Sequence, residues 1–140
     1  RDGLNDVDGH PLLYDNIAYF RQQDYYLPKD ENGQYRSYEV AGDDYSHSLE
    51  TMRGLIPTHS VFIGAVGALT GEGAIRARVG ETVLMIPHHA KRDSRPHLIG
   101  GHGDYVWESS FTDPPLQKMQ TRFVRCGCAV AAMYTFEQPG

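Results

Sequence analysis

Glycine and proline interrupt this sequence so often that a bundle of long helices is excluded. The 140 residues include 15 Gly and 8 Pro. Both residues break helices and favour turns, so this content is typical of a protein built from short β-strands. Fourteen of the aromatic residues are Tyr or Phe (nine and five), which also favours strands.

Charge and apolar content exclude two broad classes of protein. Thirteen Lys and Arg against 18 Asp and Glu give a net charge of -5, so no basic nucleic-acid-binding surface is expected. The longest charge-free apolar stretch, Val61 to Thr70, has about half the ~20 residues that a membrane-spanning helix needs. A hydrophobic content of 40% with a mean hydropathy of -0.49 indicates one globular domain with its own core.

Both ends of the sequence are expected to be cuts in a longer polypeptide. The chain begins at Arg1 without an initiator Met or a signal-peptide pattern, and Gly140 closes a turn signal directly after a strand-like run. We therefore expect residues 1–140 to form a single domain of a longer chain.

One helix and several short strands are predicted. The helix covers Asp43–Gly54, where Tyr45, Leu49 and Met52 follow helical spacing. Asn32–Gly33 predicts a hairpin turn. Strands are expected at Ile17–Leu27, His59–Ile63, Thr82–Ile86, Tyr105–Trp107, Arg122–Arg125 and Ala129–Phe136. This order lacks the alternation of strand and helix that parallel sheets need, and it predicts an antiparallel sandwich or barrel.

Two short motifs are interpreted as structural. Cys126 and Cys128 are expected to be small apolar residues of a buried strand; their spacing disfavours a disulfide, and the pair supplies only half of a four-ligand zinc site. The Asp-x-Asp-Gly sequence at residues 6–9 has too few oxygen ligands for a calcium loop.

Four of the seven His cluster in the sequence, at His88, His89, His97 and His102. Imidazole binds metals and exchanges protons near neutral pH, so this segment could form a metal site or supply a general acid. The alternative is that His88 and His89 are exposed loop residues and that His102 caps a turn.

The order of residues excludes a blue-copper site within this chain in its usual arrangement. Such a site uses a Cys on a late strand with a His after it, and here every His precedes Cys126. The glycine-rich stretches also lack the phosphate-loop and dinucleotide fingerprints.

The segment Arg92–Trp107, which reads Arg-Asp-Ser-Arg-Pro-His-Leu-Ile-Gly-Gly-His-Gly-Asp-Tyr-Val-Trp, closely resembles the second cupredoxin domain of copper-containing nitrite reductases. The resemblance covers nearly the whole chain. Further matching segments, in the same order, are Arg1–Leu4, Tyr14–Asp15, Pro28–Gly33, Met52–Arg53, Pro57–His59, Gly64–Gly71, Val79–Glu81 and Tyr134–Gly140.

This resemblance implies an all-β fold, a cupredoxin-like Greek-key β-sandwich with one short helix. It implies a dissimilatory nitrite reductase of denitrification: a periplasmic homotrimer that reduces nitrite to nitric oxide and takes electrons from a small cupredoxin or cytochrome c. The family carries type 1 and type 2 copper. The resemblance places the copper ligands outside this chain, so no metal ligand is expected within it.

Four positions of the chain match functional positions of the family. His97 matches the active-site His that relays protons at a subunit interface without binding copper, and Ile99 matches the apolar residue that shapes the nitrite pocket. Thr121 matches a Thr whose hydroxyl helps to hold that His. Gln120 stands where the family has Glu; its amide can form a hydrogen bond but adds no negative charge.

Three hypotheses follow from the sequence. The first is a catalytic fragment that contributes His97 to a shared site. The second is a non-catalytic cupredoxin-like domain that serves trimer assembly, which Gln120 favours. The third is a distinct metal-binding module built from the four clustered His.

Overall fold

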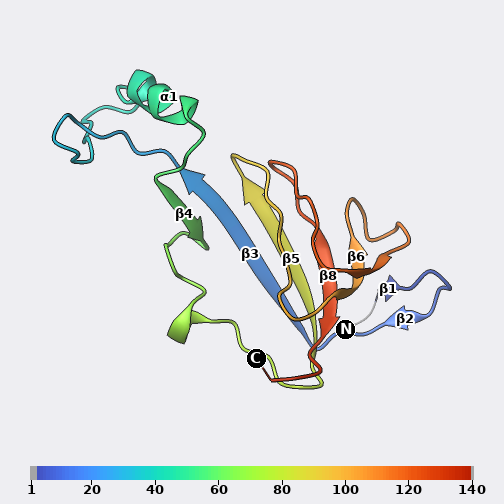
Figure 1. Cartoon of the computed structure of the whole chain (residues 1–140). Helices are drawn as coiled ribbons and strands as arrows, with labels where there is room; N and C mark the ends of the chain where they lie inside the picture. Colours follow the sequence, from blue (N-terminus) through green and yellow to red (C-terminus); the bar gives the residue numbers. More distant parts are fainter. Residues whose placement is uncertain (1–2, 140) are drawn as a thin grey trace.

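The computed structural model describes residues 3–139, and its regular structure is mostly β-strand with one α-helix (Figure 1). Arg1, Asp2 and Gly140, at the ends of the predicted domain, lie outside the described residues. The elements in chain order are β1 (Leu4–Asn5), β2 (Pro11–Leu12), β3 (Asn16–Tyr25), α1 (Tyr45–Arg53), β4 (His59–Phe62), the 3-10 turn η1 (Gly71–Gly73), β5 (Thr82–Ala90), β6 (Gly103–Trp107), β7 (Leu116–Met119) and β8 (Ala131–Thr135).

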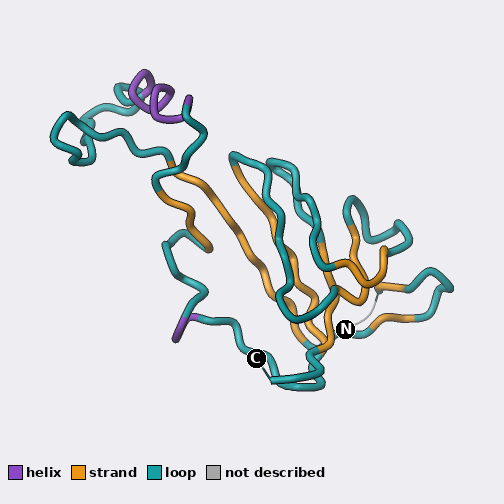
Figure 2. The backbone as a smooth tube through the Cα atoms, viewed as in Figure 1, coloured by secondary structure: helices purple, strands orange, loops and turns teal. Residues whose placement is uncertain are grey.

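Six strands form one mixed sheet in the order β4-β3-β5-β8-β6-β7, and β1 pairs with β2 in a separate hairpin. All neighbours in the large sheet are antiparallel except β3 and β5, which run parallel from Asn16 opposite Val83 to Gln23 opposite Ala90. The expectation of an antiparallel arrangement is therefore wrong for this pair. A parallel pair requires a long crossover. Here α1, β4 and η1 lie in the chain between the two strands. Loops occupy much of the remaining chain, as the glycine and proline content predicts (Figure 2).

The main hydrophobic core lies on one face of the central strands. Leu84 on β5 stands opposite Met133 on β8, and Trp107 on β6 stands opposite Ala131. Because paired residues project to the same face, these four buried side chains meet there, and Leu4 from the β1 strand packs against them. The core therefore joins β5, β6 and β8 under the small hairpin.

The predicted helix is confirmed, although it is shorter than expected. It covers Tyr45–Arg53 and ends at Gly54, whose backbone N–H donates to the carbonyl of Met52. The helix buries none of its residues, and Tyr45 is 68% exposed. Figure 1 shows the reason: α1 projects beyond the end of β3, away from the sheet.

The strands expected around residues 17, 59, 82, 105 and 129 are present with shifted ends, whereas two other expectations are wrong. Residues 122–125 do not form a regular strand of the sheet. Cys126 and Cys128 lie in an exposed turn in which Gly127 has a φ of 76°, so they are not buried strand residues. The turn at Asn32–Gly33 is confirmed: the carboxylate of Asp30 accepts the backbone N–H of Asn32 and of Gln34, each at 2.9 Å.

Within residues 3–139, no helix has the length and apolar content needed to cross a membrane.

Asp104 connects β6 to the strands on both sides of it. Its Oδ2 accepts the backbone N–H of Thr135 on β8 at 2.9 Å, and its Oδ1 accepts from Nζ of Lys118 on β7 at 2.8 Å. The hydrogen bond to Asp104 also raises the pKa of Lys118.

We therefore expect Asp104→Ala to lower the free energy of unfolding by about 1–2 kcal/mol, because the N–H of Thr135 loses its partner in a half-buried position. The measurement is urea unfolding, and Asp113→Ala in an exposed loop is the control, with an expected change within about 0.5 kcal/mol. Equal losses in the two variants would contradict the role of Asp104.

Candidate functional site

Two loop segments, residues 94–98 and 120–124, pair as a short antiparallel ladder. Ser94 and Val124 exchange both backbone hydrogen bonds, at 2.9 and 2.8 Å. Two residues further along, the N–H of Arg122 donates to the carbonyl of Pro96 at 3.2 Å. At the far end, the N–H of Leu98 donates to the carbonyl of Gln120 at 3.1 Å. Only the Ser94–Val124 pair exchanges both bonds; Pro96 lacks an N–H to return, and no bond from the N–H of Gln120 to the carbonyl of Leu98 is found among the described residues. This incomplete ladder accounts for the missing regular strand at residues 122–125.

The register of this ladder puts His97 directly opposite Thr121, as a pair flanked by backbone hydrogen bonds. Side chains of such pairs approach closely. The Nδ1 atom of His97 lies 2.5 Å from Oγ1 of Thr121, which makes a short hydrogen bond. The structure thus brings together two of the four predicted site residues.

Arg95 stands opposite Phe123 on the same face of the ladder. The guanidinium carbon of Arg95 lies 5.0 Å from the centre of the Phe123 ring, a cation–π contact. Arg95, His97, Thr121 and Phe123 are all exposed. The sequence analysis did not identify Arg95 and Phe123. The available signal was that alternate residues of an extended strand share a face, which puts residue 95 on the face of His97 and residue 123 on the face of Thr121.

The other two predicted residues form no hydrogen bond with the imidazole in the described part of the chain. Ile99 follows the ladder at the tip of a loop and is 90% exposed, with Gly100 turning the chain at a φ of 83°. Gln120 contributes its backbone carbonyl to the ladder, and no hydrogen bond joins its side chain to His97 within the described part of the chain. The structure therefore gives Thr121, not Gln120, the direct contact with His97.

A cavity of about 450 Å³ lies between the ladder and the large sheet. Residues 94–98 line one side, and Met85, Val106 and Ala132 of the central strands line another. His97 and Gln120 belong to its lining, while Thr121 and Ile99 do not. The cavity wall is mostly apolar and is continuous with the ladder that carries His97.

The four clustered His do not gather at one point. His88 and His89 are adjacent on β5, so their side chains project to opposite faces. His89 is 3% exposed; its Nε2 lies 3.8 Å from Oδ2 of Asp24, and neither ring nitrogen has a hydrogen-bond partner. His102 is exposed, and no side-chain hydrogen bond of a cap is found for it among residues 3–139. Among residues 3–139, no three of these His bring their ring nitrogens together as a metal-ligating group.

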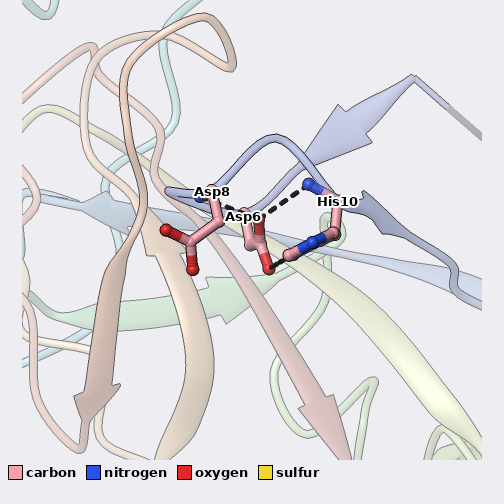
Figure 3. A group of neighbouring side chains, drawn as sticks. All are labelled: Asp6, Asp8 and His10. Atoms are coloured by element: carbon pink, nitrogen blue, oxygen red, sulfur yellow. Dashed lines mark hydrogen bonds and ion pairs between the residues drawn. The ribbon is translucent and has the colours of Figure 1, made fainter.

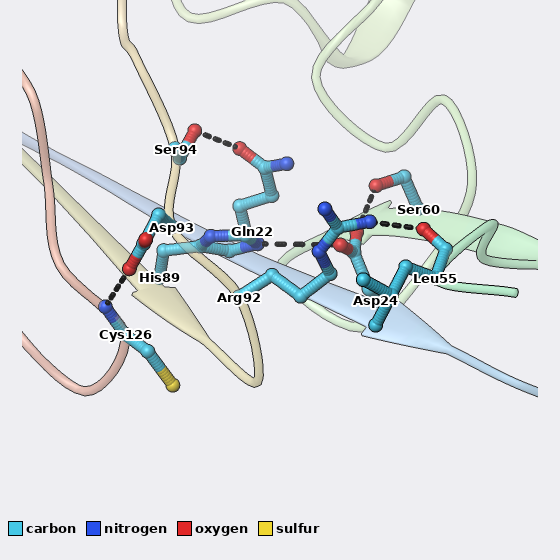
Figure 4. Close-up of polar contacts among 9 residues, drawn as sticks. All are labelled: Gln22, Asp24, Leu55, Ser60, His89, Arg92, Asp93, Ser94 and Cys126. Carbon is cyan, nitrogen blue, oxygen red and sulfur yellow. Dashed lines mark hydrogen bonds and ion pairs between the residues drawn. The ribbon is translucent and has the colours of Figure 1, made fainter. Parts of the chain in front are cut away.

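Figure 4 shows the polar contacts around His89. Asp24 accepts a hydrogen bond from Ser60, and Ser94 at the start of the ladder donates to Gln22 of β3 at 3.0 Å. Asp93 accepts the backbone N–H of Cys126 at 2.9 Å. Of these contacts, the one between Ser94 and Gln22 attaches the ladder to the sheet, and the one between Asp93 and Cys126 joins the segments that flank the ladder.

One group with metal-ligating side chains is found within the described residues, and it lies elsewhere, in the β1–β2 loop (Figure 3). One ligand atom from each of Asp6, Asp8 and His10 lies within 4.8 Å of the others. The Asp6 carboxylate already accepts the backbone N–H of Asp8 at 2.9 Å and that of His10 at 2.8 Å, and its second oxygen lies 3.1 Å from Nδ1 of His10. The arrangement is a turn closed by a side chain, which fits its place between two short strands.

Seven relatives that align with the whole chain at 50–56% identity are copper-containing nitrite reductases. No protein-family model matches the chain. It is 56% identical over 141 residues to the copper-containing nitrite reductase of Neorhizobium galegae and 55% identical to that of Alcaligenes faecalis. These alignments cover 100% of this chain but 37% and 38% of those proteins, so the chain spans less than half of their length.

Solved structures agree on the fold. A copper nitrite reductase from Nitrosomonas europaea superposes on 92% of this chain with a TM-score of 0.63 at 19% identity. A copper-containing nitrite reductase from Thermus scotoductus covers 91% of the chain with a TM-score of 0.67 at 14% identity. The expected all-β, cupredoxin-like class with one short helix is confirmed, as is the resemblance that the sequence showed.

The hydrogen bonds in the β1–β2 loop predict how Asp6 titrates. The backbone N–H of His10, helped by its side chain, holds the pKa of Asp6 below its ordinary value of 3.8. Since the folded-state pKa is lowered, the stabilisation is present above the ordinary value and is lost as pH falls.

We expect an NMR titration to show the Asp6 carboxyl titrating below 3.8, and to show the same direction in His10→Ala, which keeps the backbone N–H. A return of Asp6 to its ordinary value in His10→Ala would contradict the dominant role of the backbone.

Proposed function

Because this chain is a relative, along its whole length, of one segment of the copper-containing nitrite reductases, we propose that it is part of an enzyme that reduces nitrite to nitric oxide. In this proposal, residues 1–140 belong to the second cupredoxin domain of a longer two-domain polypeptide. The enzyme is a periplasmic homotrimer that receives electrons from a small cupredoxin or cytochrome c. The solved relatives support the domain type, since they share this fold.

The described residues do not fit a copper site. The four clustered His do not converge, and the group Asp6, Asp8 and His10 already uses the Asp6 carboxylate to close a turn. We therefore assign the type 1 and type 2 copper ligands of the complete enzyme to residues outside this chain. What this chain contributes is the handling of protons and of substrate.

The hydrogen bond between His97 and Thr121 is the observation that carries the proposal. Reduction of nitrite to nitric oxide takes one electron and two protons and releases water, so a proton donor near neutral pH is required. The Thr121 hydroxyl can accept from Nδ1–H or donate to Nδ1, and so it can hold the ring in either protonation state. The ladder thus fixes the imidazole while Nε2 remains without a partner among the described residues.

Ile99 supports the placement of this face at a subunit interface. Its side chain is 90% exposed at the tip of the loop that follows the ladder, so it is open to contact with another surface. In the proposed trimer, the neighbouring subunit covers Ile99 and His97 together, and Ile99 shapes the space that nitrite occupies.

The runner-up is a domain that serves trimer assembly without catalysis. It is favoured by Gln120, which adds no negative charge and forms no side-chain hydrogen bond with His97 in the described structure. The two functions differ in whether substitution of His97 changes turnover.

We expect His97→Ala in the full-length enzyme to lower turnover roughly 10²–10⁴-fold, the usual value of a general acid, while copper content is unchanged. Thr121→Val should lower turnover less, because the imidazole remains but is less well oriented. Steady-state nitrite reduction and copper analysis provide the measurement, and His102→Ala, an exposed His outside the ladder, is the control.

Three outcomes would decide against the proposal. If the turnover of His97→Ala is within about twofold of the wild type, the proton-donor role is wrong and the assembly role remains. Loss of type 2 copper from the same variant would make His97 a ligand. An equal loss of turnover in His102→Ala would show that the effect is not specific to the ladder.

A further inference from the structure

Arg95 lies on the same exposed face of the ladder as His97, and the proton transfer proposed for His97 gives it no role. Arg95 and His97 are two residues apart on one strand of the ladder, and their partners Phe123 and Thr121 are two residues apart on the other. Alternate residues of an extended strand share a face and lie about 7 Å apart. Arg95 and His97 therefore project from the same face of the ladder, with Phe123 and Thr121 opposite them.

Arg95 is held in place on this face. Its guanidinium carbon lies 5.0 Å from the centre of the Phe123 ring. Phe123 is fixed by the ladder, since its neighbour Val124 is 1% exposed and exchanges both backbone hydrogen bonds with Ser94. An Arg stacked on an aromatic ring keeps its N–H groups free at the edge for an anion.

The negative net charge of the chain bears on how an anionic substrate approaches Arg95. The chain carries a net charge of -5, which repels an anionic substrate over most of its surface. A fixed guanidinium adds positive charge to the face that carries His97, and no carboxylate forms an ion pair with Arg95 within the described residues.

We propose that Arg95, held over the ring of Phe123, attracts the nitrite anion to the face of the ladder that carries His97. The inference rests on the proposed function, because it takes nitrite as the substrate. It adds a substrate-steering residue to the residue that supplies protons, and it makes Phe123 a positioning residue that acts through Arg95.

The test is the salt dependence of kcat/KM for nitrite in the full-length, copper-loaded enzyme. The Debye length is about 30 Å at 0.01 M salt and about 3 Å at 1 M, so steering acts at the lower concentration only. We expect Arg95→Gln to lower kcat/KM about tenfold at 0.01 M, mainly through KM, and to match the wild type at 1 M.

Three further variants separate charge from structure. Arg95→Lys keeps the charge and should retain most of kcat/KM together with its salt dependence. Phe123→Leu should lower kcat/KM about two- to fivefold at low salt, a factor that corresponds to the usual free energy of an exposed cation–π contact. Arg53→Gln on α1 removes the same charge from a residue outside the ladder, whose only ion pair within residues 3–139 is with Glu50, and should change nothing.

The inference is overturned if Arg95→Gln loses no more than Arg53→Gln. It is also overturned if the loss is equal at both salt concentrations and is not rescued by Lys, since that pattern indicates a structural role. If Phe123→Leu leaves kcat/KM at low salt unchanged, the Phe123 ring does not position Arg95. Failure of the proposed function is a separate result: the wild-type enzyme would not form nitric oxide from nitrite, or His97→Ala would turn over normally.

Discussion

The backbone pairing between residues 94–98 and 120–124 is the constraint on which the candidate site depends. A ladder shifted by one residue would place His97 opposite Gln120 or Arg122 and leave Thr121 on the other face. Three hydrogen-bonded positions, at Ser94, Pro96 and Leu98, prevent that shift. The side-chain contact at 2.5 Å is therefore a consequence of backbone register and needs no further element to orient the ring.

The ladder in turn is fixed by its attachment to the sheet at both ends. Strand β7 ends at Met119 and continues directly into Gln120, so pairing with β6 positions the second strand of the ladder. Gly103 permits the close approach at this point, because a Cβ there would lie 2.9 Å from Val106 and 3.3 Å from the carbonyl of Met119. Arg122 forms an ion pair with Glu108 just after β6. A substitution in these strands can thus disturb His97 without touching it.

The sequence predicted the parts of the fold whose signals are local. Strands β3 and β8 are rich in aromatic and apolar residues, and the turn at Asn32–Gly33 has a specific chemistry that the structure reproduces. Strand β7 was missed because it reads Leu-Gln-Lys-Met and lies exposed at the edge of the sheet, where burial leaves no pattern. The parallel pairing of β3 with β5 depends on contacts across a long crossover, which no local pattern encodes.

The site was only partly predictable, because its contacts join residues that are distant in the sequence. Residue types alone left His97 as one of four equivalent His, and it was the resemblance to a family that singled it out. The pairing with Thr121 joins residues 24 positions apart, so it required the register of the ladder. The Cys126–Cys128 interpretation failed because Gly127 with a positive φ makes a turn where alternation suggested a strand.

A crystal structure of the full-length enzyme with copper and nitrite bound tests the central claim most directly. The account predicts that Nδ1 of His97 remains hydrogen bonded to Thr121 across the ladder, while its Nε2 faces nitrite directly or through one water and lies well beyond bonding distance of copper. A His97 nitrogen about 2.0 Å from the metal, as in a coordinated imidazole, or a ladder shifted by one residue, would contradict it.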